Sequence, residues 1–90
     1  MIEITKNTEE KIVNCGALGY NASKIASVLD VSQDEVAALL DDPNSQFSKL
    51  IQKGEDMCDY VIDLKLFELA KSGDLKALDA FEYRKKKRLS

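Results

Sequence analysis

Residues 23–40, SKIASVLDVSQDEVAALL, decide how this chain folds. Apolar side chains recur here at the three- and four-residue steps of a helix, on both sides of a short break at Asp30 and Val31. Ala26 is small where two helices would cross, and Val36 lies where it would seat the second helix on the first. The pattern predicts a helix-turn-helix, an element found both in DNA-binding proteins and in purely structural bundles.

The turn inside this stretch has Asp30 at the position where such turns most often have Gly. Asp tolerates left-handed dihedral angles better than most residues do, so we expect the turn to form. Directly after it, Ser32 and Glu35 have the spacing of a capping box. This pair predicts where the second helix of the motif begins.

One more helix is predicted before the motif, with Asn7 or Thr8 as its N-cap and an end near Gly16. After the motif, the turn-forming residues 41–45 surround Pro43 and interrupt the helical pattern. The sequence therefore predicts a three-helix module over residues 1–43.

Residues 44–90 are predicted to form a long helix over residues 45–72, followed by a second helix that runs antiparallel to it. Gly73 would supply a left-handed C-cap and Asp74 the next N-cap, so the connection is very short. The fold class is thus all-α: an N-terminal helix-turn-helix three-helix module followed by a long-helix antiparallel αα-hairpin.

The apolar stripe of the long helix is too extensive for one short partner helix to cover, which indicates a homo-oligomer. The alternative is that residues 9–40 cover the surplus within one chain, and the sequence leaves both open. The candidate oligomerisation residues are Phe47, Leu50, Ile51, Gly54, Val61, Ile62 and Leu66.

Charge is distributed unevenly along the 90 residues, whose net charge is -3. Residues 84–88 are all basic, whereas the other residues carry 8 Lys against 16 acids. Clustered cations bind polyanions by releasing counterions, although a solvated helix end has the same composition. With two residues of the predicted motif, the candidate DNA-binding residues are Lys24, Gln33, Arg84, Lys85, Lys86, Lys87 and Arg88.

The second helix of the motif is acidic, and its carboxylates repel phosphate. Gln33 is its one plausible reader of base edges, and Lys24 precedes it on the first helix of the motif. Weak or multivalent DNA binding is what this face predicts, and the competing interpretation is a protein-binding surface.

Several functional classes are excluded by what the sequence lacks. There is no His, no phosphate-binding glycine loop, and no CxxC pair, since Cys15 and Cys58 lie far apart. We therefore expect no enzymatic activity, no metal site and no cofactor. With no export signal and no apolar run of about 20 residues, we expect a cytoplasmic protein without a membrane partner.

Three segments together resemble the small terminase subunits of tailed bacteriophages: LGY at residues 18–20, KIASVLDVS at 24–32, and AKSGDLKAL at 70–78. The last is similar to the A-x-x-G-[ND]-x-x-A pattern between the two helices of the oligomerisation core in that family. The resemblance spans about residues 9–84.

This resemblance implies a non-catalytic DNA-packaging component that recognises viral double-stranded DNA as a ring-shaped homo-oligomer and regulates the terminase large subunit in the host cytoplasm. Lys24 and the second helix of the motif would contact DNA, residues 46–83 would build the ring, and the basic tail would meet DNA or the large subunit. The alternative is a small helical protein-interaction module, or a phage or prophage transcriptional regulator without a packaging role.

Overall fold

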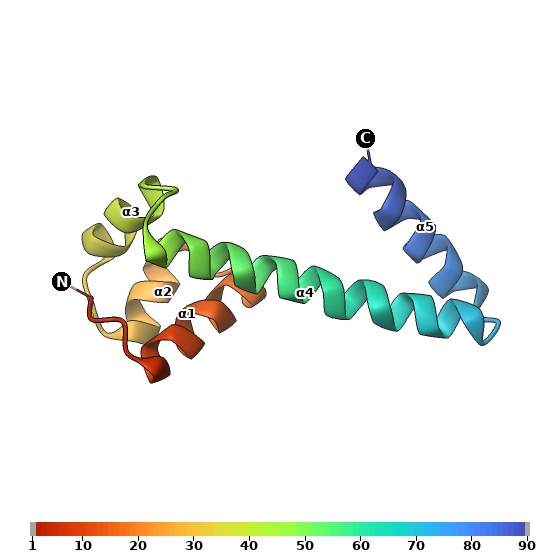
Figure 1. Ribbon diagram of the computed structural model, residues 1–90, viewed down its shortest axis with the longest axis horizontal. Coiled ribbons are helices and arrows are strands. Elements are labelled where there is room, and N and C mark those ends of the chain that lie inside the picture. Colours follow the sequence, from red (N-terminus) through yellow and green to blue (C-terminus); the bar gives the residue numbers. More distant parts are fainter. Residues whose placement is uncertain (1, 90) are drawn as a thin grey trace. The chain divides into compact units, whose positions relative to one another are not determined.

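A computed structural model describes residues 2–89, and all the regular secondary structure within them is α-helical (Figure 1). The expected all-α class is therefore confirmed. The chain divides into two compact units, a first unit up to Cys58 and a second unit from Asp59 onward. The helices are α1 (Lys6–Leu18), α2 (Ala22–Leu29), α3 (Gln33–Asp41), α4 (Gln46–Lys71) and α5 (Leu75–Leu89).

Both ends of α1 differ from the prediction. Thr5 caps its N-terminus, because its hydroxyl oxygen accepts a hydrogen bond from the Thr8 amide at 3.2 Å. The helix continues through Gly16 to Leu18 and is capped by Gly19, which has a φ of 70° and whose amide donates a hydrogen bond to the Gly16 carbonyl oxygen. The expected caps at Asn7 or Thr8 and the expected end near Gly16 were wrong. Gly16 is a helical residue, and the left-handed cap is three residues later.

The connection from α2 to α3 follows the sequence closely. Asn21 caps α2 by accepting a hydrogen bond from the Lys24 amide at 2.9 Å. Asp30 has φ 57° and ψ 49°, so the left-handed conformation expected of it is confirmed. Ser32 caps α3 by accepting a hydrogen bond from the Glu35 amide at 3.1 Å, also as predicted.

The core of the first unit joins α1, α2 and α3 to the first half of α4 (Figure 1). The predicted break at residues 41–45 does separate α3 from α4, and Ser45 caps the new helix. The compact unit nevertheless extends beyond the predicted boundary at residue 43, because α4 supplies part of its core. The buried apolar residues are Ile12, Cys15, Ile25, Ala26, Val36, Phe47 and Leu50.

Two glycines allow α1 and α4 to approach each other closely. A methyl group built on Gly54 would collide with the backbone of Val13 and Ala17, and one built on Gly16 would collide with the backbone of Ile51. Neither position can hold a side chain without moving a helix. Gly54 therefore serves packing within one chain.

This packing corrects part of the predicted oligomerisation set. Phe47, Leu50 and Gly54 are buried by their own chain, and Ile51 packs partly buried against the same core. Their apolar surface is already covered, so they do not offer it to a second copy. The alternative in which the N-terminal helices cover the stripe is correct for this part of α4.

The second unit contains the end of α4, a tight connection and α5. Gly73 has a φ of 104° and Asp74 accepts a hydrogen bond from the Ala77 amide at 3.0 Å, so both predicted caps are confirmed. The chain turns back at this point (Figure 1). The rings of Phe67 and Phe81 then lie with their centroids 5.6 Å apart.

Candidate nucleic-acid and assembly surfaces

The two candidate DNA-binding residues of the first unit are both accessible. Lys24 lies in the first turn of α2 with its ammonium group 4.5 Å from the centre of the Tyr20 ring, a distance that allows a cation–π interaction. Gln33 is the first residue of α3 and is exposed. The same helix also exposes Asp34 and Asp41. The exposed charges named here are thus one cation and two carboxylates, and carboxylates repel phosphate.

The basic segment 84–88 forms the last turns of α5, where its cations also suit the negative end of the helix dipole. Arg84 points to α4, and its Nε lies 2.6 Å from Oδ1 of Asp63. Its Nη2 lies 3.1 Å from Oδ1 of Asp59, while Nη2 of Arg88 pairs with Oδ2 of Asp63. The five cations form one run in the sequence, but in the structure both arginines form ion pairs with carboxylates of α4.

Electrostatics reinforce this cluster. The Asp63 side chain is 19% exposed, and the hydrogen bond from Arg84 lowers the pKa of its carboxyl group, with a further contribution from Arg88. In turn, the hydrogen bond to Asp63 raises the pKa of the Arg84 guanidinium. Asp63 and Arg84 are therefore both charged at neutral pH. Any phosphate that binds these arginines must compete with Asp59 and Asp63.

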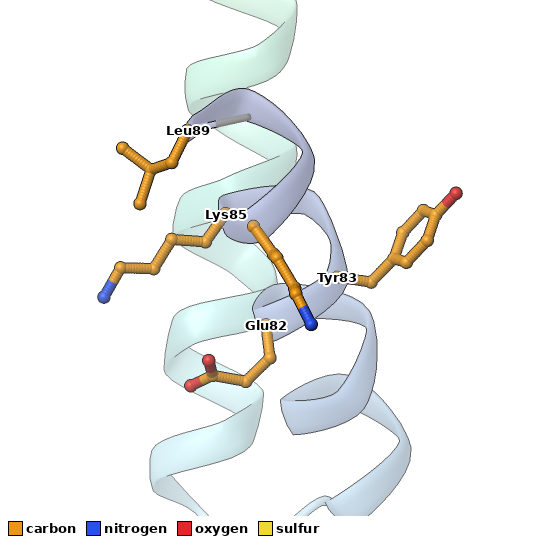
Figure 2. Close-up of a pocket in the computed structure, with 5 residues that line it drawn as sticks. Glu82, Tyr83, Lys85 and Leu89 are labelled. Carbon is orange, nitrogen blue, oxygen red and sulfur yellow. The ribbon is translucent and has the colours of Figure 1, made fainter.

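Lys85 and Lys86 are exposed and line an open hollow of about 610 Å³ together with Glu82, Tyr83 and Leu89. Figure 2 shows Lys85 and Leu89 projecting to one side of α5, whereas Tyr83 projects to the other. Lys87 is also exposed, and lines a second hollow with Asp59 and both arginines. The basic segment thus presents two chemically different surfaces.

The second unit exposes most of its large apolar side chains. Of the predicted oligomerisation residues, Val61 and Ile62 are exposed and Leu66 is half-buried. Three exposed neighbours on α4 were not among the predicted residues: Tyr60, Leu64 and Phe67, whose spacing of four and three residues is that of a coiled-coil seam. The α4 stripe, as we define it, is 40–66% exposed and consists of Tyr60, Val61, Leu64 and Phe67.

Within residues 2–89, no three His, Cys, Asp or Glu side chains lie close enough together to hold a metal ion. Both cysteines are free, and burial raises the pKa of the Cys15 thiol, which disfavours the reactive thiolate. None of the described helices combines the length and apolar character needed to cross a membrane.

Comparison of the chain with protein-family models, with curated proteins and with solved structures found no match. Function must therefore be argued from the residues themselves. The two features that carry chemistry are the exposed α4 stripe and the divided basic segment of α5.

Proposed function

We propose that this protein is a non-catalytic DNA-packaging subunit of the kind that its sequence resembles, a small terminase subunit. In this proposal the second unit assembles copies of the chain into a homo-oligomer, and the first unit contacts double-stranded DNA. The observation that carries the proposal is the α4 stripe, whose side chains are 40–66% exposed.

Physical chemistry favours a second copy of the chain as the cover for this stripe. A unit of about 30 residues is too small to bury a stable core by itself, and Ala77 is the one buried apolar residue described in it. Burial contributes about 25 cal/mol for each Å² of apolar surface, so the exposed side chains provide a large driving force for association. A seam repeated on identical helices is self-complementary, which suits a symmetric assembly.

The proposed DNA contact uses α2, the turn at Asp30 and α3 as a helix-turn-helix. Lys24 would contact a phosphate and Gln33 a base edge from the start of α3. Because Asp34 and Asp41 oppose phosphate, one copy would bind weakly, and the affinity would come from several copies on one duplex. Under the same proposal the basic end of α5 contacts DNA or the large subunit.

A second candidate function is a small helical protein-interaction module or regulator without a packaging role. It is favoured by the exposed carboxylates of α3 and by a nearby hollow of about 400 Å³ lined mainly by apolar side chains, among them Ile2, Leu39 and Phe47. A basic partner with an apolar side chain would match this surface.

The first test is the absolute mass of the purified chain, measured by light scattering over a range of concentrations at near-physiological salt. A stable assembly larger than a dimer supports the packaging subunit, and a monomer or dimer at every concentration overturns it. Fluorescence anisotropy with a short DNA duplex then tests binding, and we expect the affinity to fall steeply with salt. An assembly that does not bind the duplex would favour the interaction module.

A further inference from the structure

We infer that Asp63 is an internal competitor of phosphate: it holds Arg84 and Arg88 against α4, and leaves Lys85 and Lys86 as the polyanion-binding surface of α5. The chemical class of ligand is a polyanion of phosphodiester groups, such as a nucleic-acid backbone. The consequence for DNA affinity rests on the proposed function, whereas the ion pairs themselves do not.

The geometry of the cluster matches the way in which arginine binds phosphate. A guanidinium presents its N–H donors as a planar fork, and carboxylate and phosphate oxygens compete for the same donors. Asp63 uses one oxygen for Arg84 and the other for Arg88, and Asp59 accepts from a second nitrogen of Arg84. Both oxygens of Asp63 and two donor groups of Arg84 are therefore already engaged.

The two arginines differ in how far their side chains are exposed to solvent. The Arg84 side chain is 30% exposed and bonds two carboxylates, whereas the Arg88 side chain is 52% exposed and bonds one. An exposed pair is screened by water and salt more than a sheltered one. We therefore expect Arg88 to be the first to exchange its carboxylate for a phosphate, with Arg84 held more firmly.

Lys85 and Lys86 differ from the two arginines, because they do not belong to the ion-pair cluster. Their side chains line the hollow shown in Figure 2. Glu82 and Tyr83, both exposed, line the same hollow. An ammonium group is a point charge that contacts phosphate without a fixed fork geometry. This surface is accessible without breaking any ion pair of the cluster.

The decisive variant is Asp63→Asn, which keeps the side-chain shape and removes the charge that holds the arginines. Asp79→Asn is the matched control, since it removes one exposed carboxylate of α5 that does not belong to the cluster. Each is titrated with a short DNA duplex at several salt concentrations. If both arginines are released and contact phosphate, the slope of log affinity against log salt should steepen by about 1.8. The affinity should then fall about tenfold more than that of the unchanged chain between about 50 and 200 mM salt. Asp79→Asn should leave the slope unchanged.

Double substitutions identify which cations contact the DNA duplex. In the otherwise unchanged chain, Lys85→Gln with Lys86→Gln should flatten the slope, and Arg84→Gln with Arg88→Gln should change it little. Added to Asp63→Asn, the two arginine substitutions should cancel the gain. If the duplex binds and Asp63→Asn has the same salt slope as Asp79→Asn, the inference is overturned.

A measurement without DNA separates this inference from the proposed function. In the nuclear magnetic resonance spectrum of the full chain, hydrogen exchange at Arg84 Nε should be slow and should accelerate in Asp63→Asn. Equal exchange in both proteins overturns the inference. Slow exchange combined with no duplex binding by any variant supports the ion-pair cluster and overturns the DNA-binding function.

If Asp63→Asn loses helical circular dichroism, Asp59→Asn replaces it. This milder change removes one of the two carboxylates that hold Arg84, and should accelerate exchange at Arg84 Nε by less than Asp63→Asn does. Unchanged exchange at Arg84 in this variant contradicts the role given to Asp59.

Discussion

The two halves of α4 have the same secondary structure but opposite environments. In the first unit, Phe47, Leu50 and Gly54 lie against α1–α3 and are buried. In the second unit, Tyr60 and Leu64 remain exposed. A continuous apolar periodicity therefore does not mean that one kind of neighbour covers the whole helix. The apolar side chains of the first half are covered within the chain, and those of the second half are the ones available to the proposed assembly.

The two units also use charge differently. In the first unit, none of the described polar or charged side chains is buried. The second unit instead joins α4 to α5 through Asp59, Asp63, Arg84 and Arg88, together with the Phe67–Phe81 contact. Asp59 and Arg88 are more than half exposed, and exposed ion pairs contribute little to stability.

The largest expected effect comes from Gly54→Ala. Helix propensity alone would stabilise α4 by about 1 kcal/mol, but the added methyl group meets backbone atoms of α1, and we expect a net loss of about 3 kcal/mol or more. Urea denaturation, which gives the free energy of unfolding, measures this loss of stability. Lys53→Ala, one residue away and exposed, is the control and should change stability by less than about 0.5 kcal/mol. A stabilised Gly54→Ala variant would show that α1 does not lie against this face.

Next in size is the effect of Leu64→Asp on assembly. A carboxylate placed in a buried apolar seam should cost about 2 kcal/mol or more of association free energy for each contact that it disrupts. Light scattering should show a smaller mass at the same concentration. The comparison variant is Leu18→Asp, which places the same charge at an exposed apolar position of the first unit and should leave the mass unchanged. An equal loss of mass in both variants would show that the two units do not differ in their contribution to assembly.

Gly73→Val tests the connection between α4 and α5. A β-branched residue is strained at a φ of 104°, and we expect a cost of about 1–2 kcal/mol, localised to the second unit. Hydrogen exchange should accelerate in α5 while protection of the core amides around Val36 is unchanged. Unaltered exchange and assembly would mean that the connection tolerates a different backbone.

The smallest effect concerns pH. The hydrogen bond from Arg84 lowers the pKa of Asp63, so the ion pair contributes stability above the pH at which an unpaired aspartate titrates, about 3.9. That contribution is lost as the pH falls through the lowered pKa. Between about pH 5 and pH 2 the unchanged chain should therefore lose slightly more helical circular dichroism than Asp63→Asn does. Identical acid titrations would show that Asp63 is not paired in solution.

Local signals in the sequence predicted much of the fold. Ser32, Asp30, Gly73 and Asp74 act at the positions where their side chains or dihedral preferences indicated caps and turns. These features succeed because a cap is formed by residues within a few positions of one another. The candidate sites were less predictable. Arg84 and Asp63 are 21 residues apart, and neither sequence pattern nor charge count pairs them.

The sequence by itself determined that this chain is helical and where its α2–α3 turn lies, because helical period and capping are local properties. Only the tertiary structure decided which neighbour each apolar or charged face meets. It placed Gly54 against α1 and left Tyr60 exposed, although both belong to one periodic helix. It also paired Arg84 and Arg88 with carboxylates but gave Lys85 a separate surface. The physical reason is that burial and ion pairing depend on the approach of elements distant in sequence, which a local pattern does not encode.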